Sequence, residues 1–198
     1  MIELQPQSVL LRVNDLKQFE YCARIVFYNT VMPLDRKVTF KMQRGAEAEL
    51  QLDALEKRRT LRRYKLAAGE RRFHVWLHSD KLALSGKIDL LIVSSQGYFP
   101  VDFKYTRGRP HRNHIMQLAA YAVLVEESFQ TVVNTGLIYL APIQELVVIG
   151  ITDELKQRVM SNLLEIRQMV QEAILPAPTP VRARCQECEF RNYCGDIF

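Results

Sequence analysis

The sequence lacks the features of a membrane or exported protein. None of its apolar runs approaches the ~18 residues that a helix needs to cross a bilayer. Its first residues, MIELQPQSVLLRV, contain neither the basic segment nor the long apolar segment of a signal peptide. Internal repeats and low-complexity tracts are absent as well. We therefore expect a soluble, cytoplasmic protein with no membrane partner.

The chain also lacks a large excess of charge of one sign. Lys and Arg total 27 against 22 Asp and Glu, a net charge of +5 that only slightly favours a polyanionic partner. The basic residues gather in two segments, residues 57–72 and the stretch TRGRPHRNH. The first segment is equally consistent with a solvated helix face. The second lies beside the strand on which the candidate catalytic residues lie.

The length of 198 residues suits one α/β domain, or one domain with a small appendage. Apolar periodicity predicts helices over residues 13–28, 40–66, 113–127 and 152–174. Alternating, β-branched and aromatic segments predict strands over residues 73–78, 82–93, 98–105, 135–140 and 145–150. The segment PAPTP then ends the last helix, because proline cannot continue it.

Only four cysteines are present, and three of them lie close together near the C-terminus. Cys185, Cys188 and Cys194 have the spacing C-x2-C-x5-C, whereas Cys22 lies near the other end of the chain. Disulfides are rare in the cytoplasm, and a C-x2-C turn directs two thiolates toward one metal or cluster. The set matches the ligands of a [4Fe–4S] cluster, a [2Fe–2S] cluster or a structural zinc. Buried free thiols are the alternative.

Two of the expected strands contain acids within apolar runs. GKIDLLIV contains Asp89, and PVDFK contains Asp102 and Lys104. Because side chains alternate along a strand, Asp102 and Lys104 project to the same side, and their apolar neighbours face the core. If the two strands pair as a hairpin, Asp89 can approach Asp102 at one edge of the sheet.

These three side chains suit the hydrolysis of a phosphodiester. Carboxylates bind Mg²⁺ or Mn²⁺, and the ion activates water and neutralises charge on the phosphate. A lysine stabilises the same charge or orients the water. The alternative is an ion-pair ladder on an edge strand. Because buried acids need a cationic partner, we interpret Asp89, Asp102 and Lys104 as a catalytic, metal-binding site.

Two helical segments add candidates to this site. Glu49, in GAEAE, is a candidate catalytic residue and third metal ligand; its alternative is an exposed helix glutamate. Gln117 and Tyr121 are four residues apart and share one helix face. There they can hydrogen-bond a DNA phosphate or stack on a base, unless they form an ordinary surface patch.

The order FEYCARIVFY, RGAEAE, GKIDLL, PVDFK, QLAAY and CQECEFRNYC resembles the RecB-like nucleases of the PD-(D/E)xK superfamily. It is most similar to the Cas-four family of CRISPR-associated exonucleases, and the resemblance covers nearly the whole chain. It implies an α/β, restriction-endonuclease-like fold, with a mixed central sheet flanked by helices. Residues 1–178 would form the nuclease domain. Residues 179–198 would form a small iron–sulfur module that Cys22 closes.

The resemblance also implies roles for the candidate residues. Asp89 and Asp102 would bind Mg²⁺ or Mn²⁺, Lys104 would be the catalytic lysine, and QLAAY would supply the family's Q-x3-Y motif. Related nucleases commonly have a histidine where Glu49 stands, although glutamate also binds these metals. The four cysteines would ligate an iron–sulfur cluster, [4Fe–4S] in preference to [2Fe–2S].

The substrate implied by the resemblance is single-stranded DNA, including the overhangs of prespacers trimmed before integration into a CRISPR array. The implied partners are the Cas integrase proteins of CRISPR adaptation. Two other functions remain open: a RecB-like DNA-repair nuclease outside CRISPR, and a non-catalytic subunit that binds DNA ends.

Overall fold

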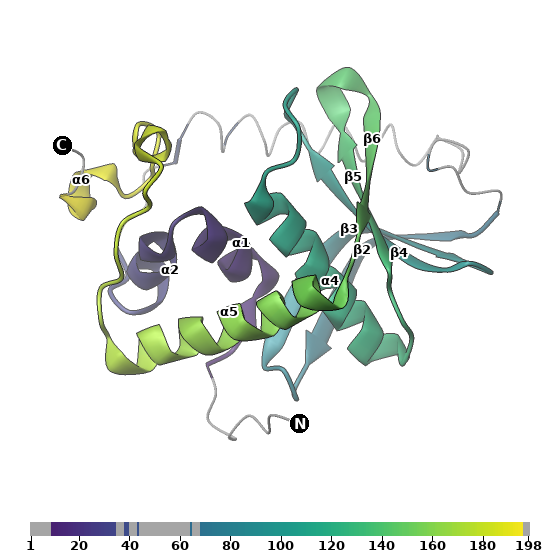
Figure 1. Ribbon diagram of the computed structural model, residues 1–198, viewed down its shortest axis with the longest axis horizontal. Helices are drawn as coiled ribbons and strands as arrows, with labels where there is room; N and C mark the ends of the chain where they lie inside the picture. The colour runs from purple at the N-terminus through teal and green to yellow at the C-terminus, as the bar shows by residue number, and fades with distance from the viewer. Residues whose placement is uncertain (1–8, 35–37, 40–42, 44–63, 65–67, 196–198) are drawn as a thin grey trace.

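A mixed sheet of six strands is the centre of the fold (Figure 1). The structure is a computed structural model that describes residues 9–34, 38–39, 43, 64 and 68–195. The strands are β1 (Leu11–Arg12), β2 (Glu70–Ser79), β3 (Leu84–Ser94), β4 (Gly97–Lys104), β5 (Thr135–Leu140) and β6 (Glu145–Gly150). The helices are α1 (Val13–Tyr21), α2 (Ala23–Thr30), α4 (Arg112–Phe129), α5 (Asp153–Glu172) and α6 (Arg191–Cys194). Short 3-10 turns are η2 (Ala141–Ile143) and η3 (Arg182–Cys185).

The connections between strands explain why the sheet is mixed. Strands β2, β3 and β4 pair antiparallel in sequence order. Helix α4 then returns the chain, so that β5 pairs parallel to β4, and β6 folds back antiparallel on β5. Strand β1 pairs in parallel with the beginning of β3. The expected α/β fold with a mixed sheet is therefore confirmed.

The helices α1, α2, α4 and α5 lie on one face of the sheet (Figure 1). Helix α4 contacts β2, β3, β4 and β5. Helices α1 and α5 pack beside α4, and α2 packs against α1 and α5; together they enclose one large apolar core. A second, smaller cluster lies on the opposite face and includes Tyr64, Val101 and Phe103. Val101 and Phe103 thus point away from α4, while Asp102 between them points toward it, as alternation along the strand predicts.

The segment predicted as one helix over residues 13–28 forms two helices, so this prediction was wrong. Cys22 has an extended backbone, with φ −164° and ψ 116°, and it separates α1 from α2. Its N–H still donates to Gln18 O at 2.7 Å, and Ile25 N–H donates to Cys22 O at 3.0 Å. Apolar periodicity identifies which face of each helix is buried, but it does not reveal a break of one residue.

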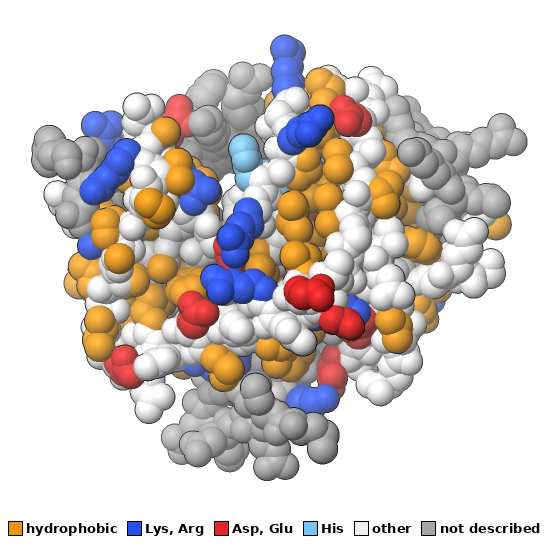
Figure 2. Space-filling model, viewed as in Figure 1, with side chains coloured by type: hydrophobic (Ala, Val, Ile, Leu, Met, Phe, Trp, Pro, Cys, Tyr) orange, Lys and Arg blue, Asp and Glu red, His pale blue; other side chains and the backbone are white. Residues whose placement is uncertain are grey.

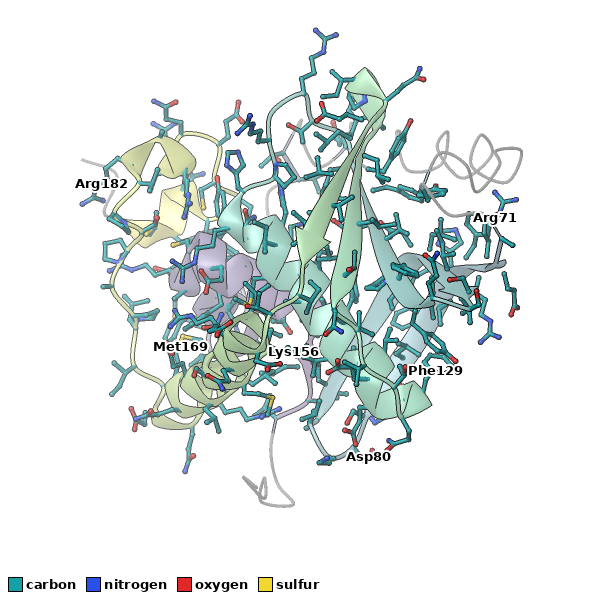
Figure 3. All side chains as sticks on the ribbon, turned by 45° about the vertical axis from the view of Figure 1, so that its right-hand side comes forward. Arg71, Asp80, Phe129, Lys156, Met169 and Arg182 are labelled. Atoms are coloured by element: carbon teal, nitrogen blue, oxygen red, sulfur yellow. The ribbon has the colours of Figure 1, made fainter. Side chains whose placement is uncertain are left out.

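A buried acid holds the helical layer together. The side chain of Glu20, on α1, is 7% exposed and lies 3.1 Å from Arg112 Nε of α4. Asn162 Nδ2 of α5 donates to the same carboxylate at 2.9 Å. Lys156 of α5, labelled in Figure 3, pairs with Glu126 of α4 at 2.7 Å. These partly buried contacts fix α1, α4 and α5 relative to one another.

The remaining expectations have mixed outcomes. The five predicted strands and the helices over residues 113–127 and 152–174 are confirmed to within a few residues at their ends. The predicted helix over residues 40–66, with Glu49, lies outside the described residues except for two positions. None of the helices described is both long enough and apolar enough to cross a membrane. The division at residue 178 and the cytoplasmic location stay predictions.

Replacing a glycine beneath α4 tests how tightly this helix packs on the sheet. A Cβ on Gly136 of β5 would lie 2.7 Å from Leu118 Cδ2, and Leu118 is fully buried. We expect Gly136→Ala to lower the free energy of unfolding by ~1–3 kcal/mol, as overpacking of a core does. Urea denaturation measures the change. Gly150→Ala on β6 is the control, because its Cβ would meet nothing within 4 Å. Equal stability of the two variants would contradict the close packing.

Candidate active site and cysteine pocket

The backbone pairing of β3 with β4 ends next to two acidic residues, Asp89 and Asp102. Backbone pairing between the two strands ends at Leu90 and Val101. One step further in this register stand Asp89 and Asp102, and the Asp89 carboxylate Oδ2 accepts the backbone N–H of Phe103 at 2.8 Å. A side-chain oxygen therefore takes the place of a backbone acceptor at this point. It holds Asp89 beside Asp102, as expected if the two strands form a hairpin.

The other edge of β3 is also interrupted at Asp89. Strand β2 pairs with β3 on both sides of this position, and His74 would be the partner of Asp89 in the same register. His74 instead has φ +53°, a left-handed conformation that is uncommon for residues other than glycine. Such backbone strain costs about 1–3 kcal/mol and tends to occur at functional sites. Asp89 is thus released from regular pairing on both sides.

Asp102 and Lys104 form an ion pair on the face of the sheet covered by α4. Asp102 is 1% exposed, and its Oδ2 lies 2.7 Å from Lys104 Nζ. Lys104 Nζ also donates to Gln117 Oε1 at 2.9 Å, and Gln117 Nε2 donates to Tyr121 Oη at 3.3 Å. Gln117 and Tyr121 therefore stand behind Lys104 and fix its ammonium group. Both are buried, and their expected contact with DNA stays a prediction.

A second lysine belongs to this site, although the sequence analysis did not identify it. Burial lowers the pKa of Lys17, on α1, to about 8, and the charge of Lys104 acts in the same direction. Asp102 and Asp89 oppose this change, so Lys17 lies in the electrostatic field of all three candidate residues. A single lysine on an amphipathic helix is ordinarily solvated, and for this reason the sequence offered no signal.

His114 at the beginning of α4 is a further neighbour. Burial, together with the nearby charges of Lys104 and Lys17, lowers its pKa to about 3. The backbone N–H of His111 donates to His114 Nδ1 at 3.4 Å, which leaves the proton of the neutral ring on Nε2. His114 therefore adds no positive charge at neutral pH, although it belongs to the basic stretch TRGRPHRNH.

The acids fit a divalent metal with oxygen ligands. Asp102 Oδ2 is buried, and no hydrogen bond reaches it from the described residues; Lys104 meets it as an ion pair only. Two neighbouring carboxylates, one with an oxygen of this kind, suit Mg²⁺ or Mn²⁺, which complete their coordination with water. In the part of the chain that the structure describes, no group of three His, Cys, Asp or Glu side chains forms a complete metal cage. Glu49, the candidate third ligand, lies outside that part.

The structure brings the four cysteines together around one pocket. Cys22 enters it from the break between α1 and α2. Cys185 comes from η3, Cys188 from the following turn and Cys194 from the end of α6. Figure 1 shows the C-terminal segment, in yellow, returning beside α2. Cys22 and the three C-terminal cysteines therefore line the same pocket, although among the described residues no three of them are grouped closely enough to hold a metal ion.

The sulfur atoms influence one another within this pocket. Burial raises the pKa of the Cys188 thiol, and the neighbouring Cys22, Glu189 and Cys185 raise it further. The backbone N–H of Phe190 opposes these effects. A positively charged group among the sulfurs would relieve the repulsion between thiolates. The donor set of four thiols therefore fits an iron–sulfur cluster or zinc.

An arginine fastens this C-terminal segment to α1. Arg184 Nη1 donates to Tyr21 O at 2.6 Å, and its guanidinium lies 4.8 Å from the centre of the Tyr21 ring. The same nitrogen lies 3.5 Å from Thr179 Oγ1. Arg182, two residues earlier, points outward (Figure 3). Arg184 therefore attaches the C-terminal segment to the last turn of α1, beside Cys22.

Comparisons with known proteins agree with this arrangement. A family model described as the PD-(D/E)XK nuclease superfamily matches residues 13–195. The chain is 29% identical over 195 residues to the CRISPR-associated exonuclease Cas4 of Francisella tularensis subsp. novicida, which covers 98% of each chain. It is 26% identical over 126 residues to a CRISPR-associated exonuclease Cas4/endonuclease Cas1 fusion of Geobacter sulfurreducens, covering 61% of this chain and 22% of the fusion. The crystal structure of SSO0001 has a similar fold, with a TM-score of 0.55 and 15% identity, covering 100% of this chain and 90% of that one.

Titration of Lys17 provides a test of the site's geometry. Its pKa of about 8 in the folded protein is below the ordinary 10.5, so the unfolded chain binds more protons between these values. Stability therefore rises with pH across this window. We expect Lys17→Met to remove that rise and to stabilise the protein near neutral pH. Urea denaturation at a series of pH values, without added divalent metal, measures both effects.

Lys87→Met is the matched control, because Lys87 is an exposed lysine on β3. This variant should keep the pH dependence of the wild-type protein. An unchanged pH dependence in Lys17→Met would contradict the position of Lys17 beside Lys104.

Proposed function

Because the chain belongs to the PD-(D/E)XK nuclease superfamily, and within it to the Cas4 family, we propose that it is a metal-dependent DNA nuclease. The observation on which the proposal depends is the hydrogen bond from the Phe103 N–H to Asp89, which brings Asp89 beside the ion pair of Asp102 and Lys104. Two carboxylates and a lysine that lie close together are the groups that metal-assisted phosphodiester hydrolysis needs.

In this proposal Asp89 and Asp102 hold Mg²⁺ or Mn²⁺, and Glu49 is a further ligand. Such an ion, when bound, supplies a Lewis acid and a more acidic water. The buried oxygen of Asp102 supports this role, because its negative charge requires a cation and Lys104 alone does not give it a hydrogen bond.

Lys104 has the task of orienting the attacking water or stabilising charge on the phosphate. Its ammonium group has three protons; one is donated to Gln117 Oε1, and the group is also paired by charge with Asp102. In this proposal another of its protons is directed at the substrate. Tyr121 holds Gln117 in turn, so the orientation of Lys104 is set before the substrate binds. Lys17 adds a second positive charge nearby.

We propose single-stranded DNA or a single-stranded overhang as the substrate. The segment that follows Lys104 exposes Tyr105, which is 51% accessible, together with Arg107 and Arg109. An exposed aromatic ring can stack on an unpaired base, and arginines pair with phosphates. Arg112 in the same segment pairs with Glu20, so its charge is partly compensated. Figure 2 shows Lys and Arg side chains gathered near the middle of one face.

The biological setting that we propose is the trimming of prespacer ends in CRISPR adaptation. The full-length relative is named a CRISPR-associated exonuclease, which supports exonuclease activity over endonuclease activity. The fusion of a Cas4 exonuclease with a Cas1 endonuclease in one polypeptide supports an integrase protein as partner. A RecB-like nuclease of DNA repair is the alternative, and gene neighbourhood separates the two.

We propose further that the four cysteines ligate an iron–sulfur cluster, [4Fe–4S] in preference to [2Fe–2S]. Their position around a single pocket supports this, as does the C-x2-C spacing of Cys185 and Cys188. The segment after α5 buries few apolar side chains, and Phe190 is its one fully buried large side chain among the described residues. Ligation would therefore stabilise a segment that apolar burial supports only weakly.

Asp102→Asn and Lys104→Met test the catalytic proposal. We expect each variant to cleave a single-stranded oligonucleotide with Mn²⁺ at least about 10²-fold more slowly, because Asp102→Asn removes a proposed metal ligand and Lys104→Met removes a positive charge that stabilises the transition state. Product formation on a denaturing gel measures the rate, and circular dichroism checks that the variant is folded.

Lys87→Met, an exposed lysine on the neighbouring strand, is the control and should cleave at the wild-type rate. Wild-type cleavage by Lys104→Met would remove the lysine from the mechanism. If the wild-type protein bound DNA in a salt-dependent manner but cleaved nothing with Mg²⁺ or Mn²⁺, it would instead be a non-catalytic protein that binds DNA ends.

The cysteine proposal predicts visible absorption, iron and acid-labile sulfide in protein purified without oxygen. We expect Cys22→Ala to lose most of the iron, because the fourth ligand is then missing. Tyr193→Ala should retain it, since Tyr193 is exposed and lies outside the pocket although it is next to Cys194. Colourless wild-type protein containing one zinc would show a structural zinc site instead.

A further inference from the structure

A buried arginine lies within the cysteine pocket. Arg24 is on α2, directly after the break at Cys22, and it is 9% exposed. An arginine is charged at every accessible pH, and its burial is unfavourable unless its donors are paired. The nuclease site described above makes no use of this residue. Its position therefore needs another explanation.

The guanidinium of Arg24 contacts the C-terminal segment at two places. Its Nε donates to Pro176 O at 2.8 Å, in the segment that follows α5. Its Nη1 lies 3.2 Å from Cys194 Sγ and 3.3 Å from Cys194 O, and donates to both. Arg24 thus connects the helix that begins after Cys22 with the most distant cysteine of the C-terminal group. One of its contacts is to the sulfur itself.

A positive donor at a sulfur has a different effect from a donor at a carbonyl group. Thiolates, not thiols, ligate iron, and hydrogen bonds from charged donors to anionic acceptors are the strong ones. Four thiolates give an iron–sulfur cluster a net negative charge. Hydrogen bonds to its sulfur atoms and nearby charges set its reduction potential. A buried guanidinium beside Cys194 Sγ is suited to compensate that charge.

We propose that Arg24 is a positioning residue of the iron–sulfur cluster, holding Cys194 beside Cys22 and stabilising the cluster's negative charge through Cys194 Sγ. The inference rests on the cluster proposed above. It assigns Arg24 no part in the cleavage of DNA. Reduction adds one electron to an already negative assembly, so this nearby positive charge also raises the reduction potential.

Arg184 provides a matched control on the same segment. It attaches the segment to α1 through Tyr21 O and the Tyr21 ring. Among the described residues, its hydrogen bonds go to oxygen atoms and not to a sulfur. Removing Arg184 loosens the attachment of the segment and leaves the hydrogen bond from Arg24 to Cys194 Sγ in place. Removing Arg24 changes both. The two effects are therefore separable.

The test compares Arg24→Gln, Arg24→Lys and Arg184→Gln with the wild-type protein, all purified without oxygen. Iron and sulfide analysis comes first, followed by the rate of iron loss to a chelator and the reduction potential of the cluster. We expect Arg24→Gln to lose iron about tenfold faster, as the loss of one charge-assisted hydrogen bond implies, and to have a lower potential. Arg24→Lys should keep a potential near that of the wild-type protein. Arg184→Gln should lose iron faster with a smaller fall in potential than Arg24→Gln, because Arg184 lines the same pocket but does not donate to Cys194 Sγ.

Wild-type potential and iron retention in Arg24→Gln would overturn this inference alone. Wild-type protein without iron and sulfide would overturn the cluster together with it, while the Mn²⁺-dependent cleavage assay would still decide the nuclease proposal. If Arg24→Gln purifies without iron, Arg24→Lys decides: iron retained at a near wild-type potential supports the role of the charge. Loss of iron from Arg24→Lys as well would contradict that role.

Discussion

At the end of β4 the backbone N–H of Phe103 has no strand partner in β3, and the carboxylate of Asp89 accepts it instead. A buried N–H needs an acceptor, so the sheet itself requires an oxygen at this position. The same bond holds Asp89 beside Asp102. The Asp89 carboxylate thus has two roles: it accepts a hydrogen bond that the sheet requires, and it is a ligand of the proposed metal site.

Much of this site could be predicted from local rules of sequence. Alternation along a strand predicted that Asp102 and Lys104 share a face, and the structure places both toward α4. Helical spacing predicted that Gln117 and Tyr121 share a face, and they form a continuous hydrogen-bonded series with Lys104. Turn and strand composition predicted β2 to β6 in their order, but not the two-residue strand β1. These features depend on neighbours within a few residues, which a single sequence displays directly.

Features that depend on distant parts of the chain could not be predicted. In the sequence, strands β2 and β3 and most of β4 lie between Lys17 and Lys104. The packing of α1 beside α4 brings Lys17 into the site. The break at Cys22 and the positive φ of His74 are backbone conformations without a glycine to mark them. The sequence FEYCARIVFY does not reveal that Arg24 is buried and hydrogen-bonded, because its partners Pro176 and Cys194 lie beyond α5. Each of these arises from tertiary structure.

Helix α1 presents Lys17 to the acids and ends immediately before Cys22. Because an α-helix rises only ~1.5 Å per residue, this helix is short, so its two ends lie close together. Arg184 donates a hydrogen bond from the C-terminal segment to its last turn. Helix α1 therefore contacts both the acidic site and the cysteine pocket. Removing the chain after α5 would remove the attachment of α1 by Arg184, and Lys17 would be held less firmly beside Asp89 and Asp102 although all three side chains would remain.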